Sequence, residues 1–541
     1  MFNWINIEFM KTRIILLITL VCGALCSCYE DESSLNYKLI NPIVIDMGGA
    51  ETSYSVFAYK ELEIKPIVYK EGIDDSNLSY KWTLSGNTII PEVLDTTMTL
   101  KKVITAKPES LPYNLLFQVV DKTTGIVQEA TFKVTVLSPF GSGLVVCDTR
   151  DEQTSDVSLI MAYNFTGNYK KENDTIMYDL FSLVNDRKIA GVATSVRSTI
   201  YGINRSLTIG TDHTIDRVDP FDYSYIDGNG SMFVIDPGKY NVSTIGYEPN
   251  SGYELLAITG KIYPRGMQKN NKVYSYYLLT TDLSDYYIKK FYRSDWDNAL
   301  GFDEKNGRLL EFDLASKLNV FNSNKLTSAE PFDWNKLQGF TCRTMFSGDN
   351  NQMHTILQEK DEATGEPKPN GKIYSYITKR VPWYDANAGQ NGWPLKVNDL
   401  SSLPGIETAQ FFDGSETQDV IYYASSNSIY SVNLAVDPVI VTKQYEAPDN
   451  EVITSMMIWK KYQGKVDYTN PNPSSDTPVL STSSSNRMLV LTTWNETKKE
   501  GTVRTVAIAT VGTGTLEKDT KKHGAFGGFG RITAINIQDA F

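Results

Sequence analysis

A strand pattern that repeats over residues 139–541 constrains the fold more than any other feature of the chain. An apolar run, a short polar turn and a second strand that often contains Ile-Tyr recur about every 57 residues. We expect the first strands of seven copies to open near Leu144, Ile200, Glu254, Arg308, Met353, Val420 and Met488. This spacing is typical of propeller blades with long loops. The sequence therefore predicts a β-propeller of seven blades, or alternatively eight, over residues 139–541.

Companion strands and the end of the chain support this prediction. Residues 260–263, 371–374 and 427–430 all place the Tyr of an Ile-Tyr pair at the same point of a hairpin. Residues 524–537 are expected to form a glycine turn and a last strand. Pairing of the two ends of the region in one blade would close the ring and remove exposed edges. We interpret residues 466–486, rich in Asn, Pro, Ser and Thr, as a surface loop between the last two blades.

A different β pattern precedes the repeat, over residues 36–138. Apolar residues alternate with polar ones from Glu61 to Tyr69, and turn residues separate further runs at 78–84, 113–120 and 130–136. About seven short strands around one buried Trp82 are typical of an immunoglobulin-like sandwich, although the two cysteines of antibody domains are absent. We therefore predict an all-β chain in which this sandwich is followed by the propeller.

The stretch from Met10 to Cys28 has the pattern of a bacterial lipoprotein signal. Basic residues precede a short apolar run from Ile14 to Val21, and Leu-Cys-Ser-Cys28 fits a lipidation site. The run is shorter than the about 20 apolar residues that a spanning helix needs, which disfavours a transmembrane anchor. We expect a signal peptide at residues 1–27, lipidation at Cys28 and an acidic tether at 28–35.

These features together resemble a known family. Tyr80-Lys-Trp82, residues 113–121 and the strand 132–136 resemble a polycystic-kidney-disease (PKD) type sandwich. The order of lipidation motif, sandwich and β-rich region is similar to the PKD-like family surface lipoproteins of Bacteroidetes, encoded beside starch-utilisation-type (Sus-type) outer-membrane transporters. The acidic residues 29–34 resemble the surface-export signal of such lipoproteins. The resemblance implies an outer-membrane lipoprotein that faces the cell exterior and has the transporter and its lid lipoprotein as partners.

Composition excludes some functions. A net charge of -12 argues against nucleic acid and against an anionic membrane surface, so contact with the membrane is expected through the lipid anchor alone. We expect Cys147 and Cys342 to be buried and unpaired, with a disulfide between them as the alternative.

Catalytic and metal-binding patterns are scarce. His213, His354 and His523 stand far apart, and no nucleophile elbow or phosphate-binding loop is present, so we predict neither a metal nor a cofactor. Acidic residues near strand ends are expected to cap turns and not to form a glycosidase pair: Asp148, Asp222, Asp295, Asp303, Asp385 and Asp413. Turns are also preferred over calcium loops at 227–230 and 413–419.

Aromatic residues in polar segments are the candidate ligand-binding groups, because rigid rings stack on sugars or anchor a partner at a low entropic cost. The candidates are Tyr223, Tyr225, Trp296, Trp383, Tyr384 and Trp393. The alternative is that these rings pack on the propeller itself.

We expect a non-catalytic, surface-exposed accessory of a Sus-type uptake complex, which binds an oligosaccharide, an oligopeptide or the transporter itself. The resemblance implies the complex, and composition alone does not. Two alternatives stay open, namely a polysaccharide-cleaving propeller enzyme and an adhesion module that binds another protein.

Overall fold

The computed structural model describes residues 41–538 with internal gaps. The gaps are residues 47–50, 59, 73–74, 87–88, 109–110, 138, 167–173, 202–203, 249–251, 268–272, 294–297, 314–315, 327–328, 381–391 and 461–485. The predicted signal peptide and Cys28 lie outside the described residues.

The described chain is all-β, as the sequence predicts. Its one α-helix within those ranges is α2 (Leu180–Asn185). No helical stretch in the described part has the length and hydropathy that a bilayer crossing requires.

The N-terminal region is a sandwich of one large sheet and two strand pairs. The large sheet has the order β2 (Ser53–Phe57), β9 (Val127–Leu137), β8 (Tyr113–Asp121), β5 (Leu78–Ser85) and β6 (Glu92–Asp95). The pairs are β3 (Glu61–Ile64) with β7 (Leu100–Val103), and β1 (Val44–Asp46) with β4 (Ile67–Tyr69). The run predicted from Glu61 to Tyr69 is thus two strands, interrupted at Pro66, whose nitrogen has no hydrogen to donate to a ladder.

The sandwich core forms around the predicted buried tryptophan. Trp82 in β5 is fully buried, and its ring stacks on Phe117 at a centroid distance of 4.1 Å. Strand β8 alternates buried and more exposed residues along its length, which places one side of the large sheet on this core. The alternation seen in the sequence therefore marks the core face of the sandwich.

The rest of the described chain forms seven further sheets. The first four are β39 (Arg531–Gln538), β10 (Gly143–Thr149), β11 (Thr154–Met161), β12 (Thr175–Met177) with β13 (Ile189–Ala190); β14 (Ala193–Tyr201), β15 (Asn204–Thr211), β16 (Ile215–Val218), β17 (Tyr225–Gly228); β18 (Val242–Glu248), β19 (Tyr253–Ile258), β20 (Lys261–Gly266); and β22 (Ile288–Arg293), β23 (Asn298–Asp303), β24 (Arg308–Asp313), β25 (Lys317–Val320), β21 (Leu279–Thr280).

The other three follow in chain order. They are β26 (Phe340–Ser347), β27 (Gln352–Glu359), β28 (Ile373–Arg380), β29 (Gly392–Asp399); β30 (Ala409–Gly414), β31 (Val420–Ser425), β32 (Ser428–Asn433), β33 (Ile440–Glu446); and β34 (Glu451–Ile458), β35 (Met488–Asn495), β36 (Glu500–Thr510), β37 (Thr515–Leu516) with β38 (Gly524–Phe529).

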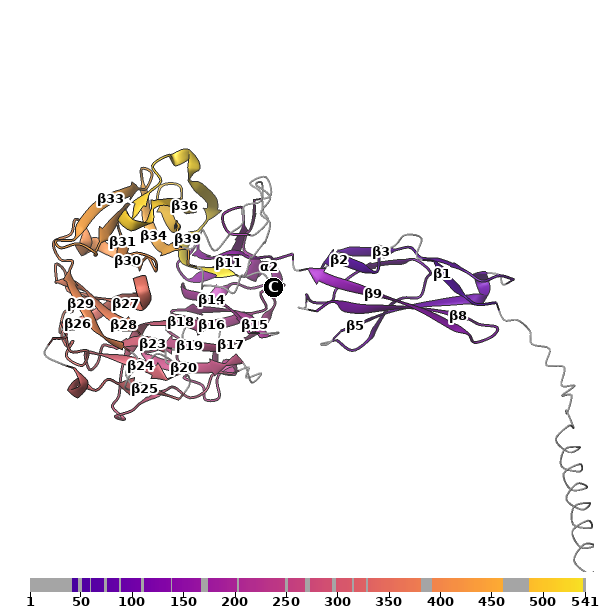
Figure 1. Ribbon diagram of the computed structural model, residues 1–541, viewed down its shortest axis with the longest axis horizontal. Coiled ribbons are helices and arrows are strands. Elements are labelled where there is room, and N and C mark those ends of the chain that lie inside the picture. Colours follow the sequence, from indigo (N-terminus) through magenta and orange to yellow (C-terminus); the bar gives the residue numbers. More distant parts are fainter. Residues whose placement is uncertain are drawn as a thin grey trace, which may run out of the picture.

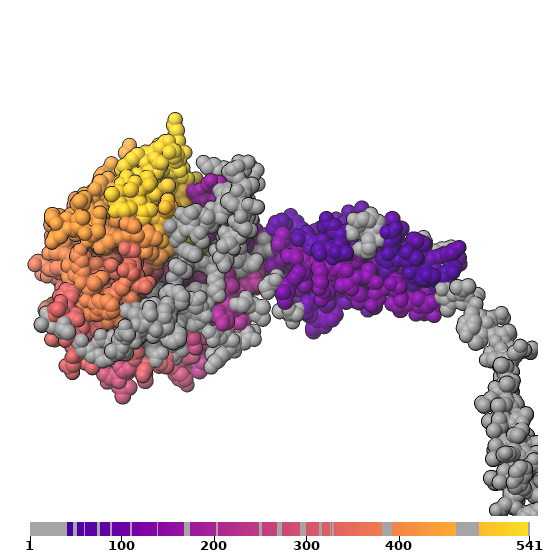
Figure 2. All heavy atoms as spheres, viewed as in Figure 1, coloured from indigo at the N-terminus to yellow at the C-terminus, as the bar shows by residue number. Residues whose placement is uncertain are grey.

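One strand of each of these sheets contacts its counterparts in the two neighbouring sheets. The contacts run from β39 to β14, β18, β22, β26, β30 and β34, and from β34 back to β39. We call these the innermost strands and the seven sheets the ring, which Figure 1 shows beside the sandwich. Figure 2 shows the same two regions with all their atoms.

The predicted pairing of the two ends of this region is confirmed. Strand β39 is antiparallel to β10, with Gly143 opposite Gln538 and Val146 opposite Ile535. The last strand of the chain is therefore the innermost strand of the sheet that begins the ring, and it contacts β14 on one side and β34 on the other.

The predicted order of strands within each copy is wrong. The runs at Leu144, Glu254, Met353, Val420 and Met488 lie in second strands, next to the innermost one. Of the other two, Arg308 begins β24, the third strand, and Ile200 lies near the end of the innermost β14. Second strands such as β10 are buried along their whole length and so form solid apolar runs, whereas innermost strands contain more polar residues.

Two further predictions concern the cysteines and the segment 466–486. Cys147 and Cys342 are buried and free, so the disulfide alternative is wrong. Residues 466–485 lie outside the described residues, but the strands that flank this segment, β34 and β35, pair with each other. The segment therefore connects two strands of one sheet and not two neighbouring blades.

Candidate functional site

Every innermost strand carries one extra residue near its start, a β-bulge opposite its second strand. The register shifts at Thr194, Ser243, the pair Lys289 and Lys290, Arg343, Gln410, Thr454 and Thr533. We call these residues the collar. A bulge turns a side chain out of the regular alternation and is frequent at rims and beside active sites.

The collar leaves a signal in the sequence that a search for strict alternation of apolar and polar residues misses. An apolar residue stands directly before each bulge and another stands three positions later, with the polar bulge residue between them. The pairs are Ala193 and Val196, Val242 and Ile245, Ile288 and Phe291, Cys342 and Met345, Ala409 and Phe412, Ile453 and Met456, and Ile532 and Ile535. A spacing of three in place of two is what one extra strand residue produces. None of the collar residues is among the site residues predicted from the sequence.

Collar side chains bond across neighbouring sheets. Thr194 Oγ1 donates to the carbonyl of Val242, the residue before the next bulge. Arg343 Nη2 donates to the carbonyl of Ala409 at 2.6 Å, again just before a bulge. The starts of neighbouring innermost strands therefore lie side by side, so the collar runs around one end of the ring, which we call the mouth end.

A cavity of about 860 Å³ opens at the mouth end. Three collar residues line it, Gln410, Thr454 and Thr533, together with hydroxyl groups of neighbouring turns and apolar side chains such as Phe411. Its volume lies in the range of ~300–1,000 Å³ that is usual for small-molecule sites. The lining is therefore mixed, with hydrogen-bonding groups beside apolar ones.

Thr533 is distinctive within this lining. Its Oγ1 is buried and has no hydrogen-bond partner in the described structure. A buried hydroxyl without a partner carries an unfavourable desolvation cost, which a ligand or a water molecule can relieve. The lining carries one ion pair, with Arg531 Nη1 3.7 Å from Glu152 Oε1 and both side chains well exposed.

The opposite end of the ring, where the innermost strands end, carries paired charges. Lys460 is buried and donates to Asp413 Oδ1 at 2.6 Å, while the amide of Ile458 donates to Asp413 Oδ2 at 2.7 Å. Ser347 links the same cluster to Tyr292 and Glu416. Burial lowers the pKa of Lys460, but its attraction to Asp413 and Glu416 outweighs burial and raises that pKa overall.

The sandwich also joins the ring at that opposite end. Lys107 Nζ lies 2.8 Å from Asp219 and 3.5 Å from Asp222, both in the turn between β16 and β17. Gln538, at the end of β39, donates to the carbonyl of Gly141 in the connecting segment at 3.2 Å. The cavity and the sandwich junction therefore lie at different ends of the ring.

Tyr223 belongs to this junction and is not a surface aromatic. It is fully buried, its ring meets Phe140 edge-on at 5.2 Å, and its hydroxyl donates to Gln538 Oε1 at 2.8 Å. The prediction that Tyr223 binds ligand is thus corrected, because the segment that joins the two regions covers it.

The other aromatic candidates that the structure describes do not lie together at one site. Tyr225 is 44% exposed and stacks beneath the guanidinium of Arg187. Trp393 is 41% exposed and lies in strand β29, paired with Lys379. Trp296, Trp383 and Tyr384 lie outside the described residues. None of the described candidates lines the mouth cavity.

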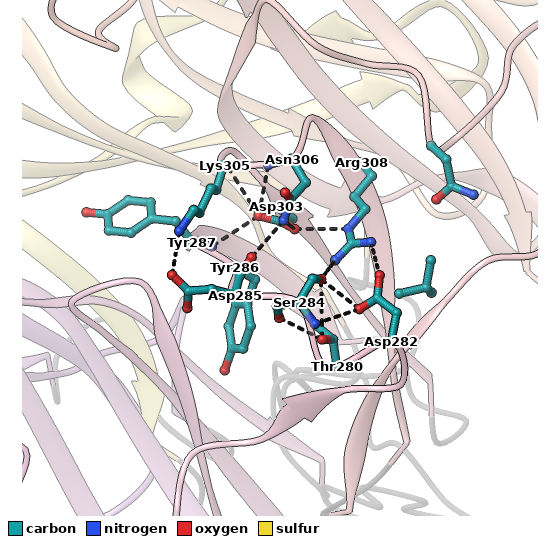
Figure 3. Close-up of polar contacts among 12 residues, drawn as sticks. Thr280, Asp282, Ser284, Asp285, Tyr286, Tyr287, Asp303, Lys305, Asn306 and Arg308 are labelled. Atoms are coloured by element: carbon teal, nitrogen blue, oxygen red, sulfur yellow. Dashed lines mark hydrogen bonds and ion pairs between the residues drawn. The ribbon is translucent and has the colours of Figure 1, made fainter.

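Two of the four described acidic residues at strand ends, Asp222 and Asp303, cap turns as predicted. Asp303 accepts hydrogen bonds from the amides of Tyr287 and Lys305 at 3.0 and 3.2 Å, and from Arg308 Nε at 3.0 Å. Figure 3 shows this cluster, in which Arg308 also reaches Asp282. The carboxylates of this cluster pair with cations, so the cluster links the loop before β22 to the turn between β23 and β24.

Of the other acidic residues, Asp222 accepts from the amide of Ser224, and Asp413 forms the buried pair with Lys460. Asp148 accepts from the amide of Gly530 at 2.6 Å, and burial raises its pKa to about 6. Asp295 and Asp385 lie outside the described residues.

Among the described residues, no group of three or more His, Cys, Asp or Glu side chains is arranged to hold a metal ion. Asp227 pairs with Arg217, so that turn is tied by an ion pair. His354 is buried in β27 beside Ser375, and burial lowers its pKa to about 3.

Comparison with protein families gives one match. The family model described as PKD-like family matches residues 28–192, which contain the sandwich and continue through β13 of the ring. The N-terminal domain is therefore PKD-like, as the sequence predicts. No curated protein matches the chain.

Two solved structures show distant similarity. A candidate 6-phosphogluconolactonase from Bacteroides uniformis has 10% identity and a TM-score of 0.42, over 74% of this chain and 100% of that one. Hsv2 from Kluyveromyces lactis has 11% identity and a TM-score of 0.30, over 61% of this chain and 95% of that one. Similarity this low identifies neither a fold nor an activity for the present chain.

Proposed function

We propose that the ring is a seven-bladed β-propeller and that its mouth end is a binding site. The cyclic contacts of the innermost strands and the pairing of β39 with β10 support the architecture. In this architecture the C-terminal strand holds the ring closed, because it pairs with the first strand of the region.

The function that we propose is non-catalytic binding of an oligomeric nutrient, and we favour an oligosaccharide over an oligopeptide. The observation that carries this proposal is the mouth cavity with the unpaired hydroxyl of Thr533 in its wall. Hydroxyl and amide groups beside apolar surface suit sugar rings, which present hydroxyls at their edges and C–H groups on their faces.

The lining also bears on the enzyme alternative. Glycosidases of the usual two-carboxylate type place two acidic groups around one bond. Among the described lining residues, Glu152 is the one carboxylate, and Arg531 neutralises it. A binding role therefore accounts for this lining better than a hydrolytic one.

We further propose that the protein is anchored through a lipid on Cys28 at the outer membrane, faces the exterior and serves a Sus-type transporter with its lid lipoprotein. The lipidation motif and the PKD-like match support this proposal. With the sandwich joined to one end of the ring, the mouth at the other end is left free for cargo.

A protein partner remains the second candidate because of one surface. Val234, Ile235, Tyr276, Tyr277 and Leu279 are each between 43% and 61% exposed. The amide of Val234 donates to the carbonyl of Tyr274 at 2.9 Å, which brings their two segments together at the outer edge of the third sheet. Exposed apolar and tyrosine side chains of this kind are common at protein interfaces.

The proposed function is tested with the full-length protein in detergent. A panel of oligosaccharides and oligopeptides is titrated against the wild type and Thr533→Val, which removes the unpaired hydroxyl and keeps the shape. Binding of an oligosaccharide that Thr533→Val alters supports the proposal. Binding of peptides alone, or binding that Thr533→Val leaves untouched while Tyr276→Ala abolishes it, would move the site to the outer edge.

The location is tested in the parent bacterium. Cys28→Ala should release the protein from membranes, and protease added to intact cells should degrade the wild type. A variant that still sediments with membranes would refute lipid anchoring at this residue, and wild-type protein that resists protease would refute surface exposure.

A further inference from the structure

The charge of the collar residues differs from one part of the ring to another. On β30, β34 and β39 its residues are neutral, Gln410, Thr454 and Thr533, and these line the mouth cavity. On the neighbouring strands β22 and β26 they are cationic, Lys289, Lys290 and Arg343. Because β22, β26 and β30 contact one another in this order, the cationic arc continues directly into the neutral one.

Two of these cations have no carboxylate partner. Lys290 Nζ donates to the carbonyl of Ser243 at 3.5 Å, and Arg343 donates to Gln358 Oε1 and to the carbonyl of Ala409. Among the described side chains, no carboxylate forms an ion pair with either residue. The charge of Arg343 therefore has only neutral hydrogen-bond partners, and that of Lys290 is offset only in part, by Glu304, which acts on it without forming an ion pair.

Lys289, on the same bulge, differs from its neighbour. Its Nζ lies 3.3 Å from Glu366 and 4.0 Å from Glu304. The bulge thus carries one lysine that is neutralised within the protein and one that is not. Burial lowers the pKa of Lys290 and of Arg343, and for Lys290 it outweighs the attraction of Glu304.

The general charge of the protein does not explain this arc. The chain carries a net charge of -12, so a concentration of unpaired positive charge at one end of the ring runs against the overall composition. Partly buried charges attract anions more strongly than charges on an open surface do.

We propose that the mouth end binds an anionic oligosaccharide, with sugar hydroxyls against Gln410, Thr454 and Thr533 and a carboxylate or sulfate of the sugar beside Lys290 and Arg343. This inference rests on the proposed function and narrows it to a ligand class. Uronate-containing oligosaccharides are the simplest members of that class.

The test uses a matched pair of probes, trigalacturonate and its fully methyl-esterified form, which differ in charge on the same sugars. Calorimetric titration of the full-length protein should show the acid binding at least about tenfold more tightly than the ester at low salt. This preference should shrink as salt is added, because ions screen the attraction.

Substitutions of the collar cations test which residues cause the preference for the acid over the ester. Lys290→Met and Arg343→Met should each lower affinity for the acid about three- to tenfold and leave affinity for the ester unchanged. Lys289→Met is the matched control, since this lysine is already neutralised, and it should keep the preference for the acid. Melting temperatures of all three variants confirm that they are folded.

The outcomes separate this inference from the proposed function. If the acid and the ester bind equally and Thr533→Val weakens both, the charged site is refuted while the mouth remains a sugar site. If Lys289→Met removes the preference as fully as Lys290→Met does, the unpaired arc is refuted as its cause. If no uronate oligosaccharide binds while a neutral oligosaccharide does, the charged site is refuted and the proposed function stands; if no oligosaccharide binds, both proposals fail.

Discussion

The two ends of the ring are built from the same seven innermost strands, but one carries a buried ion pair and the other opens into a cavity. At the opposite end, Lys460, Asp413 and Ser347 form a buried cluster in which the lysine and the aspartate are paired. At the mouth end, Thr533 Oγ1 and Asp148 Oδ1 are buried without partners, and a cavity opens beside them. Polar groups left without partners cost stability and are expected where a ligand binds.

The two ends also differ in their proposed roles, since one joins the sandwich and the other is the proposed binding site. The sandwich joins the end that carries the buried Lys460–Asp413 pair, and the cavity lies at the other end. Buried polar atoms without partners also occur at the opposite end, at Gln352, Arg380 and Asp419, so the mouth end is distinguished by the cavity beside Thr533 and not by unpaired atoms alone. We therefore expect a substitution in the buried Lys460–Asp413 pair to affect stability, and substitutions of residues that line the cavity to affect affinity.

The comparison requires a closed ring, and removal of the closing strand should have the largest effect. Deleting residues 531–541 removes β39, its ladder with β10 and its contacts with β14 and β34. We expect an aggregating or protease-sensitive product without a cooperative thermal transition. Deletion of residues 539–541 is the control. A chain lacking β39 that melts as cooperatively as the intact one would contradict closure.

Breaking the paired cluster should have the next largest effect. Asp413→Ala leaves Lys460 buried without its carboxylate, and loss of one partner of a buried pair costs about 3–5 kcal/mol in free energy of unfolding. Denaturant titration measures this loss, while ligand affinity of the folded fraction should not change. Glu446→Ala breaks an exposed pair with Lys443 and should cost less than about 1 kcal/mol. Equal costs for the two variants would contradict the account of this end.

At the mouth end, the contribution of Asp148 to the free energy of unfolding is expected to depend on pH. Burial raises its pKa to about 6, above the about 3.9 expected in the unfolded chain. Ionisation is therefore less favourable in the folded state, and this carboxyl lowers stability progressively as pH rises from about 4 to 7. Asp148→Asn keeps an acceptor for Gly530 and should raise the free energy of unfolding at pH 8 by about 1–3 kcal/mol, with no gain at pH 4. A gain that does not depend on pH would show that ionisation is not its cause.

The smallest change in free energy is expected for ligand contacts. Gln410→Ala should weaken oligosaccharide binding by about 1 kcal/mol, near the value of one hydrogen bond, and leave the melting temperature nearly unchanged. Trp393→Ala is the discriminating variant, because the aromatic residues predicted from the sequence would place the site at the 382–394 loop. If Trp393→Ala weakens binding and Gln410→Ala does not, the mouth is not the site.

The sequence predicts some elements well because their patterns are visible residue by residue. The alternation in β8 and the position of Trp82 identify the sandwich core, and the buried second strands of the ring appear as solid apolar runs. The pairing of the last strand also follows from the sequence, since a repeat with open ends would expose edges.

The site could not be predicted in the same way. Each bulge breaks the alternation that identifies strands, so the innermost strands look irregular, and their collar residues are common polar types. The residues around Tyr223 are polar and rich in turn formers, as in a surface loop. Its ring is nevertheless buried, because a segment distant in sequence, at Phe140, covers it. The spacing of three between apolar residues is visible in the sequence, but its meaning follows from the register of paired strands.

The most direct test of the account is hydrogen exchange of the full-length protein with and without the oligosaccharide that binds most tightly. The account predicts added protection at the starts of β30, β34 and β39, around Gln410, Thr454 and Thr533. It predicts no change at the other ends of the same strands, around Asp413 and Ile458. Protection at those ends, or at β29 around Trp393 with none at the mouth, would contradict the claim that the mouth end is the binding site.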